Sequence, residues 1–317
     1  MLEEIPRVDL SDPAAPRIVG QAFREIGFVF IKAPELTGLL RECYAEFAKV
    51  FALPQEAVKR GYERAEIGHQ RGWTPHQTEQ AIACRNTGPA GVAQPNEYEC
   101  WFIGPETVED ETLLKRYPVA YHPNLWPAEA PTFRAPMLRL YDALYDVGRR
   151  MLRAVEVDIG YKKGFFDEML FDSATVMRAL HYPPVRPEQV GKVVLGCEHT
   201  DINLVTVLPA STRPGLWIQR RDGKWIPGMA PEGYAIGQVG DMLSLLVGGH
   251  FLSAKHEVRA PNEATEVGRY SAAMFMHPRS DVWLHPDARW ADPAIHQPVE
   301  AGAWLHQRLI DIGILKA

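Results

Sequence analysis

Residues 193–208 read Val-Val-Leu-Gly-Cys-Glu-His-Thr-Asp-Ile-Asn-Leu-Val-Thr-Val-Leu, two apolar runs separated by the polar tetrapeptide Glu198–Asp201. Short apolar runs bounded by turn-forming residues are typical of β-strands. The same texture continues on both sides, and it predicts about eight or nine short strands, in the segments 175–182, 193–199, 203–208, 216–219, 224–226, 234–239, 243–247, 256–259 and 269–276. Such close spacing indicates an all-β sandwich or barrel, of which the jelly roll is one form.

Helical patterns flank this strand-rich part. Apolar residues recur at three- and four-residue intervals in two long segments, Leu36–Phe51 and Thr132–Asp158, which predicts two amphipathic helices. A shorter helix is expected over residues 12–26, because an aspartate followed by proline supplies a cap and a first-turn residue. The continuous apolar run Phe28–Ile31 then suits a strand buried on both faces. A last helix is predicted around residues 299–314.

These elements divide the chain into four expected segments. The fold class that they predict is mainly β with flanking helices, in which an N-terminal α/β extension precedes a jelly-roll core. The segments are an N-terminal region of helices and short strands (1–115), a helical segment that packs on the core (116–170), the jelly-roll core itself (171–280) and a C-terminal helical segment (281–317).

Composition narrows the class of partner. The chain has 317 residues and a formal net charge of −6, whereas nucleic acids and anionic membranes attract strongly basic surfaces. We therefore expect a small-molecule substrate, with no nucleic-acid or membrane partner, and a monomer or a homodimer. The first ten residues carry Glu3 and Glu4 and no apolar core of a secretory signal, and no run reaches 18 apolar residues. The expected location is the cytoplasm.

A candidate metal site lies at the end of the second predicted strand. His199 and Asp201 are two residues apart, so they share one face of a strand. His256, at the start of a later strand, is the candidate third ligand. Two imidazoles and one carboxylate can occupy one face of a metal ion's coordination octahedron and leave three positions open. A second H-x-D triplet, His285-Pro286-Asp287, is a poorer candidate because its proline breaks strand geometry.

An anion-binding pair follows the third candidate ligand. Arg269 and Ser271 lie two residues apart at the start of the last predicted strand and therefore share a face. A guanidinium and a hydroxyl on one face can hold a carboxylate, because the planar fork of arginine meets both oxygens and stays charged when buried. Alone, such an arginine could equally be an ordinary surface residue.

With these motifs in hand, the sequence resembles the isopenicillin N synthase-like group of 2-oxoglutarate/Fe(II)-dependent dioxygenases over nearly its whole length. The likeness rests on the H-x-D, distal His and R-x-S order of the C-terminal half. It rests also on three N-terminal stretches, namely Ile5-Pro6-Arg7-Val8-Asp9-Leu10, Glu25-Ile26-Gly27-Phe28-Val29-Phe30 and the segment Phe47 to Pro54. The resemblance implies a double-stranded β-helix core.

The resemblance also implies a role for each motif residue. His199, Asp201 and His256 would bind Fe(II), and Arg269 and Ser271 would bind the distal carboxylate of 2-oxoglutarate, with assistance from Tyr182. With O2, such an enzyme would hydroxylate, desaturate or cyclise a small molecule and release succinate and CO2. The chain departs from many plant members in two places, where Leu180 replaces an asparagine and Lys32-Ala33-Pro34 replaces Asn-His-Gly.

The position of the substrate is the least constrained part of this interpretation. By resemblance, the pocket is lined by the N-terminal loop region and the last core strand, which nominates Arg71, Trp73, Trp101 and Phe275. Each also has a structural interpretation, because tryptophans commonly fill cores and a loop arginine is commonly solvated.

Three other functions are compatible with parts of the pattern. An oxidase of the same group, like isopenicillin N synthase itself, would keep the R-x-S pair without consuming 2-oxoglutarate. A non-catalytic jelly-roll binding protein could keep the metal triad as a structural element. A zinc hydrolase could use two histidines and a carboxylate, but the sequence contains no H-E-x-x-H motif.

Overall fold

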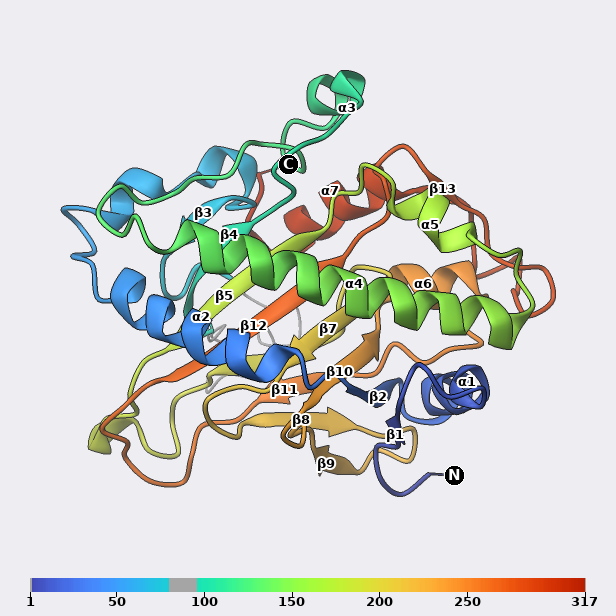
Figure 1. Cartoon of the computed structure of the whole chain (residues 1–317), viewed down its shortest axis with the longest axis horizontal. Helices are drawn as coiled ribbons and strands as arrows, with labels where there is room; N and C mark the ends of the chain where they lie inside the picture. The colour runs from blue at the N-terminus through green and yellow to red at the C-terminus, as the bar shows by residue number, and fades with distance from the viewer. Residues whose placement is uncertain (1, 80–95, 317) are drawn as a thin grey trace.

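In the computed structural model, which describes residues 2–79 and 96–316, the chain folds around two facing β-sheets (Figure 1). The eight-stranded sheet has the order β1 (Arg7–Val8), β2 (Phe28–Lys32), β10 (Tyr234–Val239), β7 (Val205–Pro209), β12 (Arg269–Met276), β5 (Val176–Tyr182), β4 (Glu99–Ile103) and β3 (Gly72–Thr74). The four-stranded sheet has the order β6 (Gly196–His199), β11 (His256–Val258), β8 (Leu216–Gln219) and β9 (Trp225–Pro227). A separate strand pair, β13 (Trp283–Leu284) and β14 (Val299–Glu300), precedes the last helix.

Helices surround the two sheets. They are α1 (Ala15–Glu25), α2 (Leu36–Phe51), α3 (Glu111–Arg116), α4 (Arg134–Ile159), α5 (Phe165–Leu170), α6 (Asp241–Leu246) and α7 (Ala301–Asp311). Short 3₁₀ turns in the described residues accompany them, among them η1 (Lys59–Tyr62), η2 (Ala65–Ile67) and η5 (Pro187–Gln189). The long helix α4 crosses the large sheet and contacts α1, α2, β7 and β12 (Figure 1). The predicted strand-rich core with flanking helices is therefore present.

The strand β2 shows how the sequence sets these layers. Alternate residues of a strand point to opposite faces. Val29 and Ile31 pack into the large core beneath the helices, whereas Phe28 and Phe30 pack between the two sheets against residues of β8 and β10. Because both faces are covered, every position of this strand except the last is apolar, as the uninterrupted run at 28–31 predicted.

One predicted strand is wrong, because residues 241–246 form the helix α6 rather than a strand over 243–247. A short apolar run does not distinguish a buried strand from a buried helix. Here the buried side chains are Met242, Leu243 and Leu246, which share one helical face, and none of them is β-branched. Gly248 and Gly249 both adopt positive φ and end the segment.

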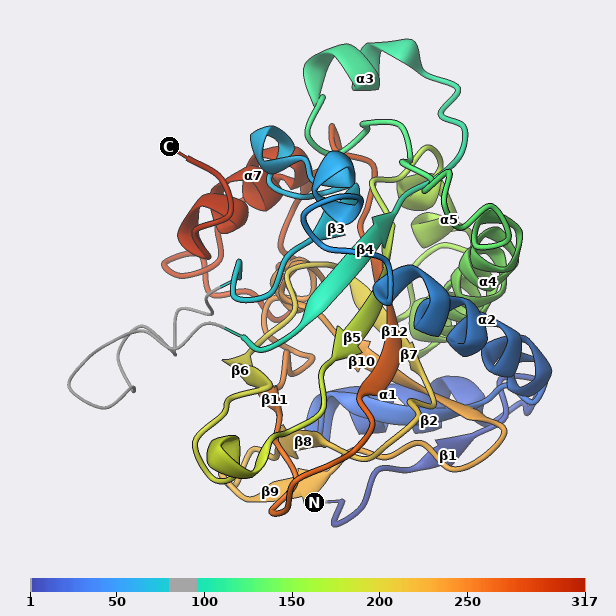
Figure 2. The ribbon, with the colours of Figure 1, turned by 90° about the vertical axis from the view of Figure 1, so that its left-hand side faces the viewer.

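Two strands of the large sheet, β3 and β4, come from the part of the chain between Phe51 and residue 105, for which the sequence predicts no individual strand. β4 pairs with β5 in antiparallel register, and β3 pairs with β4 so that Trp73 lies opposite Trp101. The C-terminal part seen in Figure 2 carries α7, as predicted, together with β14 directly before it. The core sheet therefore extends beyond the expected segment 171–280 into the N-terminal part of the chain.

The contact between α4 and the large sheet depends on Gly148. A Cβ at this position would collide with Met276 Sδ and lie 3.1 Å from Val207 Cγ2. We expect Gly148→Val to destabilise the protein by about 1–3 kcal/mol, because overpacking forces neighbouring side chains out of their rotamers. Urea unfolding at equilibrium measures this change.

The matched control for this prediction is Gly38→Val on α2. A Cβ at Gly38 meets no atom within 4 Å among the described residues, so the free energy of unfolding should stay within about 0.5 kcal/mol of the wild-type value. Equal effects at the two glycines would contradict a tight contact at Gly148.

Candidate metal centre and active-site cavity

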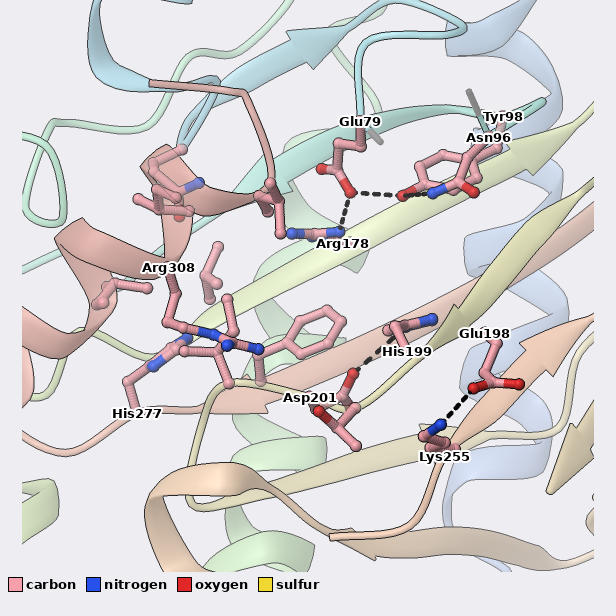
Figure 3. Close-up of a pocket in the computed structure, with 18 residues that line it drawn as sticks. Glu79, Asn96, Tyr98, Arg178, Glu198, His199, Asp201, Lys255, His277 and Arg308 are labelled. Atoms are coloured by element: carbon pink, nitrogen blue, oxygen red, sulfur yellow. Dashed lines mark hydrogen bonds and ion pairs between the residues drawn. The ribbon is translucent and has the colours of Figure 1, made fainter. Parts of the chain in front are cut away.

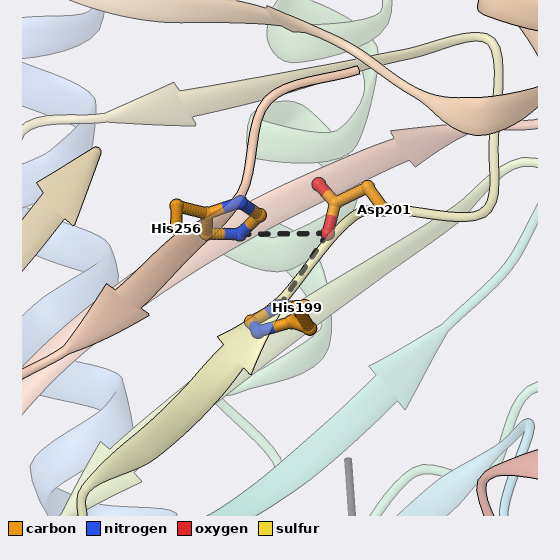
Figure 4. Close-up of side chains that lie close together, drawn as sticks. All are labelled: His199, Asp201 and His256. Carbon is orange, nitrogen blue, oxygen red and sulfur yellow. Dashed lines mark ion pairs between the residues drawn. The ribbon is translucent and has the colours of Figure 1, made fainter. Parts of the chain in front are cut away.

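Strand pairing brings the three candidate ligands together. His256, the first residue of β11, lies directly opposite His199, the last residue of β6, and Asp201 follows in the connection to β7. One ligand atom from each residue lies within 4.8 Å of the others. The Asp201 Oδ1 is 3.6 Å from His199 Nε2 and 3.6 Å from His256 Nε2 (Figure 4). His199 and Asp201, which are close in sequence, therefore meet His256 from a distant strand.

The arrangement fits a metal ion better than it fits mutual hydrogen bonding. The two 3.6 Å separations exceed hydrogen-bond length, and the two imidazole rings lie 4.2 Å apart between centroids. The His199 Nδ1 contacts the Cys197 carbonyl oxygen at 2.6 Å, which directs Nε2 toward the carboxylate. Burial, reinforced by His199, lowers the pKa of His256 to about 4, so this imidazole is neutral near pH 7, as a metal ligand must be.

The far oxygen of Asp201 is held by two buried side chains. Its Oδ2 accepts hydrogen bonds from Thr206 Oγ1 and Gln238 Nε2, each at 2.5 Å. Asn203 Nδ2 donates in turn to Thr206 Oγ1 at 3.0 Å. These contacts leave Oδ1 facing the histidines and fix the carboxylate orientation. Sequence reasoning missed Gln238, which lies on β10, because only the sheet pairing brings it to the ligand.

Arg269 and Ser271 begin β12 and share its face with Phe275, as their spacing predicted. Both are buried, and Arg269 pairs in register with Tyr182 on β5. The guanidinium lies 4.8 Å from the Tyr182 ring centroid, and its Nε donates to the Arg213 carbonyl oxygen at 3.0 Å. Within the described part of the chain, the buried Nη1 of Arg269 has no hydrogen-bond partner. The guanidinium is thus held through its Nε, while its Nη1 is available to donate to an acceptor such as a carboxylate.

A cavity of about 240 Å³ opens beside the triad and has His199 and Asp201 in its wall (Figure 3). Its apolar wall includes Phe275, the one predicted substrate residue among the described side chains that line it. Its polar lining includes six residues that are not among the predicted substrate contacts, namely Glu79, Arg178, Glu198, Lys255, His277 and Arg308. The cavity is therefore an apolar chamber with charged groups at several points of its wall.

The other three predicted substrate residues lie outside this lining. Arg71 is buried against backbone, where its Nη2 donates to the Ala120 carbonyl oxygen at 2.9 Å. Trp73 Nε1 donates to Glu99 Oε2 at 2.7 Å, and Trp101 Nε1 donates to a backbone carbonyl at 2.9 Å. Both tryptophans belong to the large hydrophobic core. Their placement therefore supports a structural role for these three residues rather than contact with the substrate.

The comparisons with known proteins identify the family. A model described as the 2OG-Fe(II) oxygenase superfamily matches residues 171–278, and a model described as non-haem dioxygenase in morphine synthesis N-terminal matches residues 5–129. The chain belongs to the 2OG-Fe(II) oxygenase superfamily. It is a non-haem Fe(II)- and 2-oxoglutarate-dependent oxygenase that uses O2 and acts on a small molecule.

Three relatives of this oxygenase, two from plants and one from a fungus, illustrate the similarity. Kihadalactone A synthase LFS of Citrus sinensis is 27% identical over 95% of this chain and 90% of the relative. The 2-oxoglutarate-dependent dioxygenase citB of Monascus ruber is 28% identical over 89% of this chain and 87% of the relative. Homoarginine-6-hydroxylase 2-ODD-C23.2 of Arabidopsis thaliana is 28% identical over 78% of this chain and 67% of the relative.

Solved structures show the same architecture. A putative 2OG-Fe(II) oxygenase family protein from Caulobacter crescentus superposes with a TM-score of 0.82 at 28% identity, over 98% of this chain and all of that one. A full-length Neurospora crassa protein, solved in complex with alpha-KG and thymine, superposes with a TM-score of 0.81 at 25% identity, over 98% of each chain. The double-stranded β-helix core expected for this oxygenase is thus confirmed. In the described residues, no helix is long and apolar enough to cross a bilayer.

The contact between Gln238 and Asp201 generates a prediction about metal affinity. Gln238→Leu removes one of the two donors to Asp201 Oδ2 while keeping a side chain of similar volume. We expect the affinity of the oxygenase for Fe(II) to fall roughly 10–100-fold, because such orienting contacts tune metal ligands. Anaerobic titration of metal-free protein with Fe(II) measures it.

Gln219→Leu is the control for this measurement, since Gln219 lies on β8 and its side chain donates to the Gly223 carbonyl oxygen in the turn that follows. It should leave the Fe(II) affinity unchanged. An unaltered affinity in Gln238→Leu would show that Asp201 needs no such support.

Proposed function

We propose that His199, Asp201 and His256 hold the Fe(II) of this oxygenase. The observation that carries the assignment is the convergence of two Nε2 atoms on one carboxylate oxygen at 3.6 Å each, from one side. With iron bound there, 2-oxoglutarate and O2 supply the oxidising chemistry, and 2-oxoglutarate leaves as succinate and CO2. The chain's own residues provide ligation, orientation and a water-poor chamber.

The distal carboxylate of 2-oxoglutarate would bind Arg269 and Ser271, beside Tyr182. The free Nη1 of Arg269 supports this assignment, because among the described residues nothing else satisfies that buried donor. The Tyr182 ring and the Arg213 carbonyl oxygen fix the guanidinium, so little side-chain entropy is lost on binding. Leu180 lies opposite Ser271 in the sheet and adds an apolar surface where many plant relatives have an amide.

The cavity beside the triad would hold the substrate. Phe275 shares its strand face with Arg269 and Ser271, so the chamber and the carboxylate pair lie along the same side of β12. Apolar side chains from α7 and the residue after it, Leu305, Leu309 and Ile312, line the chamber and limit water access. We retain the segments 1–115, 116–170, 171–280 and 281–317 as a working division, with a monomer or a homodimer as the assembly.

His256→Ala tests the metal assignment. Loss of one buried ligand should abolish stoichiometric Fe(II) binding in anaerobic titration, together with succinate formation from 2-oxoglutarate. His306→Ala, on the exposed side of α7, is the control and should retain both. Full Fe(II) binding by His256→Ala would overturn the ligand set.

Arg269→Ala tests the 2-oxoglutarate assignment separately. Removal of a buried charge partner should raise the 2-oxoglutarate concentration needed for half-maximal succinate formation by roughly 30-fold or more, with Fe(II) affinity little altered. Arg186→Ala, at an exposed arginine that pairs with Glu188, is the control. An unchanged 2-oxoglutarate requirement, or substrate-dependent O2 uptake without 2-oxoglutarate, would contradict the proposal.

A further inference from the structure

Glu79 lines the cavity and carries one carboxylate oxygen without a hydrogen-bond partner in the described residues. Its side chain is 8% exposed, and its Oε2 accepts hydrogen bonds from Tyr98 at 2.5 Å and from Arg178 Nη1 at 3.0 Å (Figure 3). The other oxygen, Oε1, is buried and has no hydrogen-bond partner within residues 2–79 and 96–316. A buried acceptor left unsatisfied is unfavourable by about 1–3 kcal/mol. The site therefore calls for an N–H or O–H donor from a ligand.

Arg178 holds this carboxylate in place. The guanidinium lies between two aromatic rings, 4.3 Å from the Phe102 centroid and 4.8 Å from the Phe275 centroid, and its ion pair with Glu79 is largely buried. Stacking on rings and a charged hydrogen bond leave the arginine little freedom. We treat Arg178 as a positioning residue that fixes the orientation of the Glu79 carboxylate in the cavity wall.

Arg308 provides a cationic hydrogen-bond donor at another part of the cavity wall. It is on α7, on the same helical face as the cavity-lining Leu305, Leu309 and Ile312, and it lies apart from Glu79 in Figure 3. Its Nη2 makes one long contact of 3.3 Å with Asp241 Oδ2, and its buried Nε is without a partner in the described chain. A guanidinium has five donors, so most of its capacity is available for a carboxylate.

His277 does not add charge beside these groups. Burial, with Arg178 nearby, lowers the pKa of His277 to about 3, so the imidazole that lines the cavity is neutral near pH 7. The described lining then contains three acidic residues, Glu79, Glu198 and Asp201, and three basic residues, Arg178, Lys255 and Arg308. Glu79 pairs with Arg178, Glu198 pairs with Lys255 and Asp201 is assigned to the iron, so neither sign of charge dominates the wall that faces the substrate.

From these contacts we infer that the substrate is a small zwitterion, an amino acid or a related ammonium carboxylate. Its cationic N–H group donates to Glu79 Oε1, its carboxylate binds Arg308, and its apolar body contacts Phe275 and Ile202. The inference rests on the proposed function, since it places this molecule in the chamber beside the iron ligands. A volume of about 240 Å³ limits the molecule to a small one.

Derivatives of one molecule test the two ends in the wild-type protein. The probes are the standard L-α-amino acids and short β- and ω-amino acids, each titrated by calorimetry into anaerobic protein loaded with Fe(II) and 2-oxoglutarate. We expect at least one free amino acid to bind, and its N-acetyl and methyl ester derivatives to bind roughly tenfold or more weakly. The inference would be overturned if none of the free amino acids bound. It would also be overturned if the N-acetyl and methyl ester derivatives bound as tightly as the free amino acid.

Two variants assign each end to a residue. Glu79→Gln should weaken binding of the free amino acid roughly tenfold or more but leave its N-acetyl derivative unaffected. Arg308→Gln should do the same for the free acid and leave its methyl ester unaffected. Arg139→Gln, at an exposed arginine of α4, is the matched control. Equal losses for the free acid and the derivative would mean that the substituted residue only supports the fold.

The same preparations separate this inference from the proposed function. Fe(II) and 2-oxoglutarate binding, and slow succinate formation without any amino acid, report on the oxygenase site alone. If these persist while the amino acids fail to bind, only the zwitterion inference falls. If Fe(II) or 2-oxoglutarate does not bind, the proposed ligand set or carboxylate pair falls first.

Discussion

The antiparallel pairing of β6 with β11 is the constraint on which the active site depends. It places His199 opposite His256, although a large part of the catalytic core separates them in the sequence. A slip of one residue in this register would turn one histidine to the other face of the sheet. The register is protected because β11 is also paired with β8 on its other side. Backbone hydrogen bonds thus set the relative positions of the two histidines.

Around that pairing, several polar side chains have one atom that is hydrogen-bonded to the protein and another that is not. Asp201 Oδ2, Arg269 Nε and Glu79 Oε2 all have protein hydrogen-bond partners. By contrast, Asp201 Oδ1 faces the two histidines, and Arg269 Nη1 and Glu79 Oε1 have no partner within the described residues. Fixing one atom of a polar group orients the other without ligand-induced rearrangement. This pattern indicates a preorganised site, in which binding a ligand removes an existing desolvation penalty.

Much of this structure could be predicted from residue spacing, and the limits have physical causes. The shared face of Arg269 and Ser271 was predictable because the two-residue repeat of a strand fixes which side chains point the same way. The same argument was wrong for Asp201, because β6 ends at His199 and Asp201 reaches the histidines from the connection that follows. Glu79 and Arg308 were not predictable, since they reach the cavity only through the packing of a loop and a terminal helix on the sheets. The error at residues 243–247 arose because a short leucine-rich run satisfies both helical and extended patterns when both are buried.

The division of labour between strands and α7 has a consequence for how such enzymes diversify. The proposed iron ligands and carboxylate pair belong to the β framework, while Arg308 belongs to a helix that packs against it near the end of the chain. Substitutions on one face of that helix can alter which molecules are accepted without disturbing the oxidising centre. Selection can therefore act on substrate choice and on redox chemistry through separate sets of positions.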